Sequence, residues 1–270
     1  MKKVILVTGA SAGMGKEFAK ELLNDGHIVY GAARRVDKMD DIKVLGVKVL
    51  EMDVTDDASM IKGVNDIAKA EGRIDVLINN AGFGSYGAVE DVSIDDAKYQ
   101  LNVNVFGAAR LAQLVLPHMR KQHFGRIINI TSIGGKLALP LGGWYHASKF
   151  ALEALSDSLR NEVEQFGIDV VVIEPGGVKS EWAGIAGDNL LKVSGNGVYG
   201  ALTRQFGAII KKTEANNAEP IVIVDLVRKA IEAKKPKTRY AGGYMAKMAL
   251  FMRKILPDRT FDKMMLSQLK

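Results

Sequence analysis

Short apolar runs alternate with helix-spaced patterns along the chain. The first run, residues 4–7, is apolar throughout, which is typical of a strand buried on both faces. Beyond a glycine-rich turn, Phe18, Leu22 and Leu23 recur at helical spacing, and Gly26 predicts the end of that helix. The alternation repeats at least six times, so the sequence predicts one α/β domain. We expect a Rossmann-type, doubly wound parallel sheet with helices on both faces.

The glycine-rich turn joins the first predicted strand to the first predicted helix. It reads Thr8-Gly9-Ala10-Ser11-Ala12-Gly13-Met14-Gly15. Glycines let the backbone approach a pyrophosphate, and a helix N-terminus offers free N–H groups and the positive end of its dipole. The spacing differs from the common dinucleotide fingerprint, in which glycines occupy relative positions one, three and six. The turn therefore predicts a phosphate site, and the alternative is an ordinary glycine-rich turn.

A tyrosine and a lysine stand four residues apart where another helical pattern begins. Tyr145 and Lys149 share one face of the helix that Phe150, Leu152 and Leu155 predict. The pKa of a free tyrosine is about 10, and a fixed cation nearby lowers that pKa because it favours the phenolate. The pair therefore predicts a general acid and base. The alternative is a half-buried ring beside a solvated lysine.

Taken together, these motifs resemble those of the short-chain dehydrogenase/reductase family. The two carriers of the resemblance are Thr8-Gly9-x-x-x-Gly13-x-Gly15 and Tyr145-x-x-x-Lys149. Further family positions match in order, namely Asp53, Asn79-Asn80-Ala81-Gly82, Asn104, Ser132 and Pro175-Gly176. The similarity covers roughly residues 1–180, and six motifs in the same order are far more specific than any one of them.

The resemblance implies a role for four residues in catalysis. Tyr145 would exchange a proton with the substrate oxygen, while Lys149 would lower the pKa of Tyr145 and hold the nicotinamide ribose. Ser132 would bind the substrate oxygen, and the alternative is a turn serine at a strand end. Asn104 would link Lys149 to solvent through water, and the alternative is a helix-interior asparagine with a solvent-facing amide.

The resemblance also implies a nicotinamide dinucleotide held by residues from every motif. These are Gly9, Ser11, Gly13, Met14, Gly15, Arg34, Arg35, Asp53, Val54, Asn80, Ala81, Gly82, Tyr145, Lys149, Pro175, Gly176, Val178 and Ser180. Asp53 would contact the adenine. Two positions depart from the family pattern: Met14 stands where isoleucine or leucine is commoner, and Ser180 stands where a threonine usually bonds the nicotinamide amide. Both replacements keep the chemistry that the position needs.

The end of the second predicted strand favours NADP(H) over NAD(H). NAD-preferring relatives place an acid about twenty residues past the glycines, where it binds the ribose hydroxyls. Ala33 occupies that place here and is followed by Arg34 and Arg35. A guanidinium binds a 2′-phosphate through two hydrogen bonds and stacks on adenine, whereas a carboxylate would repel the phosphate. The alternative is two surface arginines without a ligand.

We expect the substrate to be bulky and apolar. Between Gly176 and Pro220 the chain holds apolar residues interleaved with glycines, and Trp182 among them is expected to contact the substrate together with Ser132 and Tyr145. Such a segment is typical of a lid over the nicotinamide, and also of a locally packed surface segment. The residues around Tyr145 resemble the branch containing 17β-hydroxysteroid and retinol dehydrogenases. That resemblance implies a ketone, aldehyde or alcohol.

Composition narrows the remaining function classes. The chain has 270 residues and no cysteine, which excludes disulfides, thiol catalysis and cysteine-bound metals. Its histidines lack metal-ligand spacing, so no metal site is expected. No apolar run is long enough to span a membrane, and no signal peptide is expected. We expect a cytoplasmic homodimer or homotetramer whose single domain comprises a core (1–180), a substrate lid (181–220) and a basic helical segment (221–270).

Three interpretations of the function compete. The favoured one is an NADP(H)-dependent oxidoreductase that interconverts a carbonyl and an alcohol. A sugar-nucleotide epimerase or dehydratase shares Tyr-x-x-x-Lys, but such relatives commonly show Gly-x-x-Gly-x-x-Gly and a larger C-terminal domain, and this chain has neither. A non-catalytic NADPH-binding regulator typically loses the tyrosine or the lysine, whereas both are present here.

Positive charge collects near the C-terminus. The formal net charge is +6, and residues 221–270 hold twelve Lys or Arg against four Asp or Glu. A solvated basic face is the favoured interpretation, with an anionic membrane or nucleic acid as alternatives and no nucleic-acid motif to support the latter. Met245, Met248, Met252 and Ile255 predict an apolar helix stripe. We expect it to cover the domain's own core or a subunit contact, and the alternative is a cap beside the substrate that touches a membrane.

Overall fold

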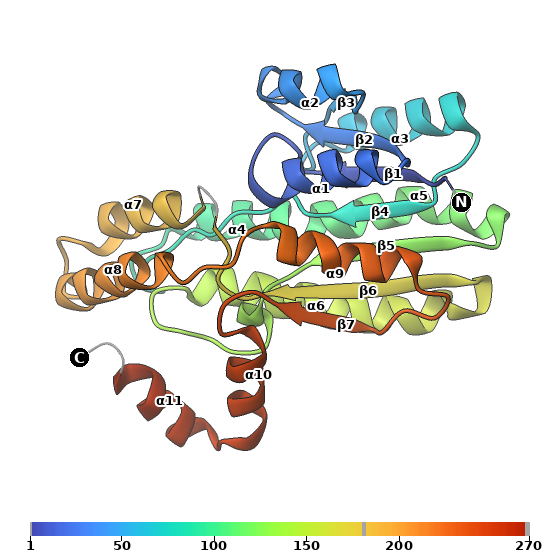
Figure 1. Cartoon of the computed structure of the whole chain (residues 1–270). Coiled ribbons are helices and arrows are strands. Elements are labelled where there is room, and N and C mark those ends of the chain that lie inside the picture. Colours follow the sequence, from blue (N-terminus) through green and yellow to red (C-terminus); the bar gives the residue numbers. More distant parts are fainter. Residues whose placement is uncertain (1, 180–181, 268–270) are drawn as a thin grey trace.

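The structure, a computed structural model, describes residues 2–179 and 182–267 and is built on one parallel sheet (Figure 1). Within those residues, seven strands lie in the order β3-β2-β1-β4-β5-β6-β7, and neighbouring strands are parallel. The strands are β1 (Val4–Thr8), β2 (Ile28–Ala33), β3 (Lys48–Glu51), β4 (Val76–Asn79), β5 (Gly125–Ile130), β6 (Ile168–Pro175) and β7 (Arg239–Gly242). One sheet thus organises the chain, which confirms the predicted single α/β domain.

The helices fall into three groups by position. Those beside the sheet are α1 (Gly13–Asn24), α2 (Asp40–Leu45), α3 (Asp57–Glu71), α4 (Ile94–Leu101), α5 (Ala108–Gln122), α6 (Gly143–Val163) and α9 (Ile221–Glu232). Beyond one edge lie α7 (Trp182–Ser194) and α8 (Gly200–Glu214), and the chain ends in α10 (Ala246–Ile255) and α11 (Asp258–Ser267) (Figure 1). Shorter turns are the π-helical η2 (Asn102–Gly107) and the 3₁₀ helices η1 (Val36–Met39), η3 (Ile133–Gly135) and η4 (Glu164–Phe166).

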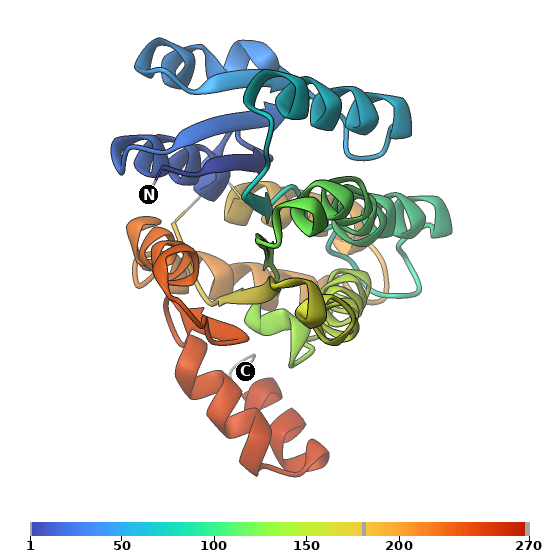
Figure 2. The same cartoon turned by 90° about the vertical axis from the view of Figure 1, so that its right-hand side faces the viewer.

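Helices cover both faces of the sheet, as predicted (Figure 2). On one face, α1, α2 and α9 bury apolar side chains in a common core, in which Phe18 and Val227 are fully covered. On the other face, α3 and α5 form a second core that includes Ile67 and Leu111. All of β1 is buried because its side chains alternate between the two cores. Burial of each large apolar side chain contributes roughly 1.5–3 kcal/mol.

The sheet topology fixes where a ligand site can lie. Because all strands run the same way, their carboxyl ends meet at one edge. The chain moves outward from β1 in one direction through β2 and β3, and in the other through β4 to β7. Ligands of such sheets bind where the strand order reverses, which is here between β1 and β4. The glycine-rich turn and Asn80 stand at that point.

The C-terminal helices depart from one expectation. The predicted helix over Met245 to Ile255 exists as α10, but its stripe does not cover the domain's own core. Met248, Phe251 and Ile255 are 59%, 59% and 52% exposed, and α10 and α11 project away from the sheet and its covering helices (Figure 2). The division of the chain into core, lid and basic segment stays a prediction, as does the oligomeric state. No helix among residues 2–179 and 182–267 has the length and apolar character needed to cross a bilayer.

Candidate active site

The glycine-rich turn forms a backbone cradle at the start of α1. Gly9 and Gly13 have φ values of +69° and +52°, which suit glycine because it lacks a Cβ. A Cβ on Gly15 would overlap with the carbonyl oxygen of Gly9 and the amide of Asn80. The helix begins without a side-chain cap at Ala12 and without an acid in its first turn. Its first N–H groups therefore face the turn and fit a phosphate.

Asn80 ties the turn to the end of β4. Its Nδ2 donates to the carbonyl of Thr8 at 2.9 Å. The hydroxyl of Thr8 in turn accepts the backbone N–H groups of Asn80 and Ala81, at 3.0 Å each. These bonds join the carboxyl ends of β1 and β4 at the reversal of strand order. Thr8 was part of the sequence motif, but its hydroxyl as the link between the strands was not predicted.

Tyr145 and Lys149 stand on the first turns of α6 and are 8% and 7% exposed. Their four-residue spacing places the ammonium Nζ of Lys149 5.9 Å from the centroid of the Tyr145 ring. The same Nζ donates to the carbonyl of Ile130, at the end of β5, at 3.0 Å. Lys149 is thus a buried cation with a fixed position, and the alternative of a solvated lysine is wrong.

Burial has the largest effect on both pKa values. It raises the pKa of the Tyr145 phenol, and a hydrogen bond to the Ser132 hydroxyl opposes that rise. It lowers the pKa of Lys149 to about 8, against the charge of Glu153 one turn further along α6. The sequence predicted that Lys149 would lower the pKa of Tyr145. In this structure the phenol's pKa is raised, because burial outweighs the effect of its polar neighbours.

Ser132 is the turn serine that the sequence gave as its alternative, and its hydroxyl also lies beside Tyr145. It follows β5, and its hydroxyl caps η3 by accepting the N–H of Gly134 at 3.0 Å. The same hydroxyl donates to the carbonyl of Pro175 at 3.4 Å and bonds Tyr145. The turn that Ser132 caps therefore also fixes its hydroxyl beside the phenol.

Asn104 lies inside the π-helical turn η2 and is 1% exposed. Its Oδ1 accepts the N–H of Phe83 at 3.1 Å, and its Nδ2 donates to the carbonyl of Phe83 and the hydroxyl of Ser148, at 2.9 Å each. A solvent-facing amide is therefore the wrong interpretation. A Cβ on Gly82 would lie 3.1 Å from Asn104 Oδ1 and 3.6 Å from Lys149 Nζ, so these three residues meet at one point.

His146 supports the segment that leads into Tyr145. The N–H of Leu139 donates to its Nε2 at 3.0 Å, while its Nδ1 lies 2.9 Å from the carbonyl oxygen of Gly134. Because the carbonyl can only accept, Nδ1 carries a proton, and because Nε2 accepts the N–H of Leu139, the ring is neutral. Burial lowers its pKa, in agreement with a neutral ring. The sequence gave no role to His146, since only the fold brings residues 134 and 139 to its two nitrogens.

At the predicted adenine end, β2 and β3 finish side by side. Ala33 is buried, and the side chain of Arg34 extends from it into solvent, where Nη1 donates to the hydroxyl of Tyr99 at 2.8 Å. Arg35 is also exposed and precedes η1. Asp53 follows β3, and its Oδ1 accepts the N–H and the hydroxyl of Thr55, at 2.9 and 2.7 Å. Tyr99 is a neighbour of Arg34 that the motifs did not predict.

The predicted nicotinamide end lies where β6 finishes. Pro175 closes the strand, and the N–H of Gly176 donates to the carbonyl of Gly242 in β7 at 2.8 Å. Gly177 and Tyr244 exchange two backbone hydrogen bonds of 3.0 and 2.9 Å, which anchors the start of the C-terminal helices here. Val178 follows and is partly buried, whereas Ser180 lies outside the described residues. Trp182 begins α7, and its side chain lies outside the described part as well.

An apolar enclosure covers the ring of Tyr145. It contains Tyr86 from the loop after β4, Leu141, Leu190 of α7 and Phe206 of α8, all buried. The ring centroids of Tyr86 and Tyr145 are 5.5 Å apart, and those of Tyr86 and Phe206 are 6.3 Å apart. The segment predicted as a lid therefore packs next to the candidate acid. Tyr86 was not predicted, because no local pattern distinguishes it from other loop tyrosines.

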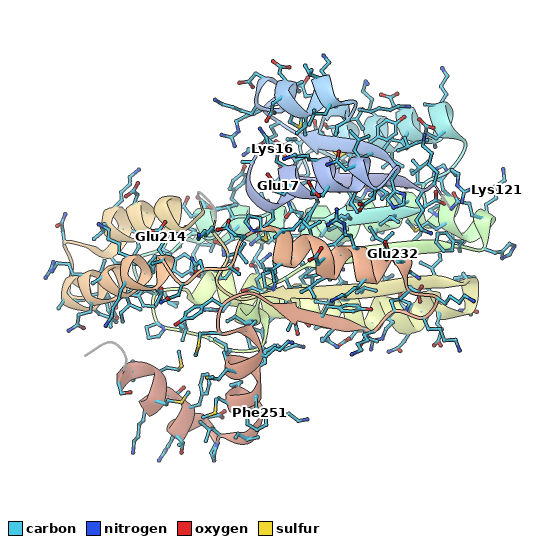
Figure 3. The ribbon with its side chains drawn as sticks, viewed as in Figure 1. Lys16, Glu17, Lys121, Glu214, Glu232 and Phe251 are labelled. Carbon is cyan, nitrogen blue, oxygen red and sulfur yellow. The ribbon has the colours of Figure 1, made fainter. Side chains whose placement is uncertain are left out.

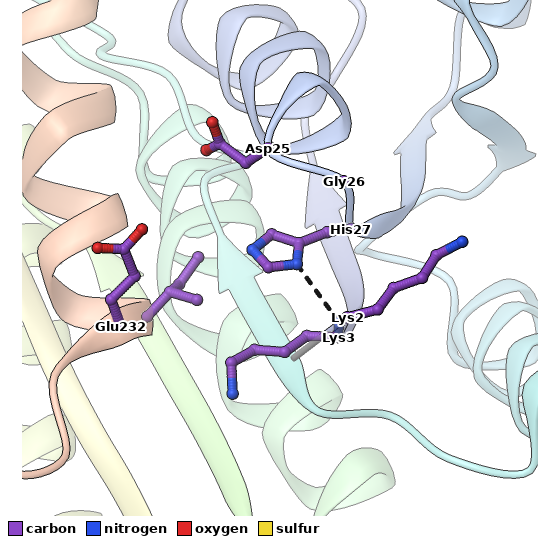
Figure 4. Close-up of a pocket in the computed structure, with 7 residues that line it drawn as sticks. Lys2, Lys3, Asp25, Gly26, His27 and Glu232 are labelled. Atoms are coloured by element: carbon purple, nitrogen blue, oxygen red, sulfur yellow. Dashed lines mark hydrogen bonds between the residues drawn. The ribbon is translucent and has the colours of Figure 1, made fainter.

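A polar pocket at the opposite edge of the sheet is separate from this site (Figure 4). It is lined by Lys2, Lys3, Asp25, Gly26, His27, Ile231 and Glu232. The backbone N–H of Lys3 donates to Nδ1 of His27 at 3.4 Å. Since these residues precede β1 and β2 or end α9, the pocket lies at the amino ends of the strands. The grouping around Tyr145 and the glycine cradle lies at their carboxyl ends.

Comparison with known proteins places this site in a family. The model of the family described as short chain dehydrogenase matches residues 3–189. The chain is 38% identical over 258 residues to a 3-ketodihydrosphingosine reductase of Bacteroides thetaiotaomicron, with coverage of 95% of this chain and 94% of the relative. It is 34% identical to an NADPH-dependent 3-dehydrocapnine reductase of Ornithobacterium rhinotracheale, with coverage of 98% and 96%.

Solved structures have the same fold. A short-chain dehydrogenase from Streptomyces avermitilis is 32% identical, with a TM-score of 0.81 and coverage of 93% of this chain and 91% of the other. A Burkholderia phymatum chain in complex with NAD (23% identical, TM-score 0.76, coverage 89% and 88%) and a metagenomic chain in complex with NADP (26%, 0.70, 89% and 96%) also match. These two neighbours were thus solved with different nicotinamide cofactors. The chain belongs to the short-chain dehydrogenase/reductase family of oxidoreductases.

Proposed function

We propose that the chain is an NADPH-dependent reductase that converts the ketone of a long-chain, amine-bearing substrate into an alcohol. The observation that carries this proposal is the placement of Tyr145, with Ser132 and Lys149 beside it, under the apolar enclosure of α7 and α8. A proton donor buried against apolar rings suits a carbonyl that is attached to an alkyl chain.

The glycine cradle fits the cofactor that this chemistry requires. Gly9, Gly13 and Gly15 leave room for a pyrophosphate at the N-terminus of α1, and Gly82 leaves room beside Lys149. A bound nicotinamide would supply or accept the hydride. On the side of the protein, Lys149 would hold the ribose hydroxyls, and residues 175–178 would border the nicotinamide.

The proton in this mechanism comes from Tyr145. As the carbonyl oxygen becomes an alkoxide, the phenol would donate its proton to that oxygen, and the Ser132 hydroxyl would stabilise the developing charge. The buried cation of Lys149 would then favour the phenolate that is left. Asn104 would act through Lys149 and the backbone of Phe83, as a positioning residue.

The choice of NADPH rests on the end of β2. Ala33 offers no carboxylate to bind ribose hydroxyls, and the exposed guanidinium of Arg34 is free to leave Tyr99 for a 2′-phosphate. A guanidinium–phosphate contact would outweigh the bond to a neutral phenol, because the two opposite charges attract and the guanidinium can donate two parallel hydrogen bonds to a phosphate. The NADPH dependence of the 3-dehydrocapnine reductase supports the same choice.

The substrate class rests on the two relatives and on the enclosure. Both relatives are named for reduction of a carbonyl at carbon 3, and sphingosine denotes a long-chain amino alcohol. The enclosure of Tyr86, Leu190 and Phe206 is apolar and suits the alkyl chain next to such a carbonyl. This assignment is more specific than the substrate class that the sequence predicted, which was a bulky apolar ketone, aldehyde or alcohol.

Turnover by the purified chain tests the proposal. NADPH oxidation would be followed with 3-ketodihydrosphingosine, a short-chain analogue with the same amino ketone, a steroid ketone and retinal, with NADH in parallel. We expect the highest kcat/KM for the long-chain amino ketone with NADPH, and turnover lower by a factor on the order of 100 or more in the Tyr145→Phe control. Faster reduction of the steroid or of retinal would contradict the substrate class. NADPH binding without turnover of any carbonyl would favour the regulator instead.

A further inference from the structure

The last two helices form a unit of their own, here called the C-terminal hairpin (residues 245–267). Arg253 of α10 pairs with Asp258 at 2.6 Å, and its guanidinium lies 5.5 Å from the ring centroid of Phe261, which is 3% exposed. These contacts fix α11 against α10. The hairpin stands apart from the sheet, with Phe251 on α10 well away from the strands (Figure 3).

The hairpin presents apolar side chains that do not take part in its own packing. Met248, Phe251 and Ile255 follow helical spacing on one side of α10, whereas the buried Ala246 and the paired Arg253 lie on the opposite side. Met245 and Leu266, which stand at the two ends of the hairpin in sequence, are each 44% exposed as well. A chain in water rarely exposes so many large apolar residues on one short unit without a partner.

Basic side chains flank the apolar surface. Lys247 and Lys254 lie one on each side of Phe251 in sequence and share its side of α10, and Arg259 and Lys263 are exposed on α11. Among residues 2–179 and 182–267, no carboxylate lies within ion-pair distance of these four cations. Only two acids, Asp258 and Asp262, belong to the hairpin, and Asp258 is paired with Arg253.

The hairpin is rooted at the candidate active site. Tyr244, which directly precedes it, is bonded to Gly177, and a Cβ on Gly176 would overlap with the carbonyl oxygen of Tyr244. The hairpin therefore emerges where β6 ends, at the same edge of the sheet as α7 and α8 (Figure 1). The root of the hairpin therefore lies at the same edge of the sheet as the candidate active site.

We propose that the C-terminal hairpin docks on an anionic lipid bilayer, with Met248, Phe251 and Ile255 in the interface and the flanking cations on the lipid headgroups. Exposed apolar residues bordered by Lys and Arg are the features by which helices lie on such surfaces. Docking would bring the site to a long-chain substrate that is dissolved in the bilayer. That last step rests on the proposed function, whereas the docking itself does not.

A second copy of the chain fits this surface less well. A two-fold contact would place the same surface against itself. The cations Lys247, Lys254, Arg259 and Lys263 of both copies would then lie close together, and such like-charge contacts are unfavourable. An anionic bilayer instead gives each cation an opposite charge.

Co-sedimentation of the full chain with vesicles tests the proposal without any substrate. One vesicle is pure phosphatidylcholine, and the other contains phosphatidylglycerol as well. We expect binding to the anionic vesicle to be at least about tenfold stronger, and to fall by about tenfold or more in Lys247→Glu/Lys254→Glu and in Met248→Ser/Phe251→Ser. Matched controls are Lys234→Glu/Lys235→Glu, which changes the same charge outside the hairpin, and Val44→Ser/Val198→Ser, which removes two apolar residues that are 87% and 89% exposed elsewhere.

The outcomes separate docking from its alternatives. The proposal is supported if the control variants bind vesicles like the wild type and the hairpin variants do not. All of the variants must also bind NADPH normally, which shows that they are folded. Absence of vesicle binding by the wild type, or an equal loss in the controls, would overturn it. So would a wild-type oligomer that dissociates in Met248→Ser/Phe251→Ser, because a second copy would then cover the surface. If the chain binds vesicles but reduces no long-chain ketone, docking stands and the proposed function fails.

Discussion

The hydroxyl of Thr131 donates to the buried carboxylate of Glu153 at 2.6 Å, one residue before Ser132. Glu153 is 3% exposed and also binds the guanidinium of Arg239 and the ammonium of Lys136, at 2.9 Å each. It stands one helical turn after Lys149 on α6, where its charge raises the pKa of that lysine against the effect of burial. The carboxylate of Glu153 thus binds Thr131, just after β5, and also raises the pKa of Lys149.

Glu153→Gln is expected to move the alkaline limb of the kcat/KM profile to lower pH. Burial lowers the pKa of Lys149, and the charge of Glu153 opposes that effect. Without this charge the pKa of Lys149 should fall below its present value of about 8. Lys149 then loses its proton at lower pH, and with it the charge that holds a ribose and favours the phenolate. The matched control is Asp157→Asn, which also removes a partner of Arg239 (2.7 Å) but lies further along α6. An equal shift in both variants would contradict a specific effect on Lys149.

Tyr145→Phe is expected to lower turnover by a factor on the order of 100 or more while NADPH affinity stays nearly unchanged. The variant removes the proton donor and keeps the ring that packs against Tyr86. Steady-state kinetics and fluorescence titration with NADPH measure the two effects. Near-normal turnover would remove Tyr145 from the mechanism.

Local rules explain why much of the site was predictable. The cradle at Gly9, Gly13 and Gly15 follows from backbone freedom, and the pairing of Tyr145 with Lys149 follows from helical spacing. Both depend on residues close in sequence, and the structure has the positive glycine φ values and the Tyr145–Lys149 proximity that these patterns predict.

Contacts between distant segments were beyond sequence reasoning. The enclosure joins Tyr86, Leu190 and Phe206 from three separate segments, and no spacing rule connects them. The amide of Asn104 turns inward only because the π-helical turn places it against Phe83 and Ser148. For a related reason, the sequence predicted a lowered pKa for Tyr145, whereas the structure raises it. Burial is the cause, and burial depends on how the whole chain packs.

Cofactor preference is expected to follow the residues at the end of β2. The wild type should have a higher kcat/KM with NADPH than with NADH, and Ala33→Asp/Arg34→Ala should shift the preference toward NADH by at least about tenfold. The reason is that a charge-assisted hydrogen bond contributes roughly 1.5–3 kcal/mol and that the new carboxylate would bind ribose hydroxyls. Tyr99→Phe is the control, since it removes the present partner of Arg34 and keeps the guanidinium. Equal efficiency of both cofactors in the wild type would contradict the assignment.

His146 is expected to make the fold sensitive to acid. Burial lowers its pKa below the usual 6.5, so the folded chain binds this proton more weakly than the unfolded chain. The stability that follows is fully present above the unfolded pKa and is lost as the pH falls below it toward the folded pKa. Protonation would also place a proton on Nε2, where the N–H of Leu139 now donates.

The measurement is thermal unfolding of the wild type and of His146→Gln between about pH 7.5 and pH 5.5. The melting temperature of the wild type should fall further over this pH range than that of the variant, because glutamine does not titrate. His27→Gln is the matched control, since burial also lowers the pKa of His27, which lies at the opposite edge of the sheet. If His27→Gln reduced the acid sensitivity as much as His146→Gln does, the hydrogen bonds of His146 to residues 134 and 139 would not be the source of that sensitivity. Loss of turnover at about pH 5.5 ahead of unfolding would locate the effect in the segment that leads into Tyr145.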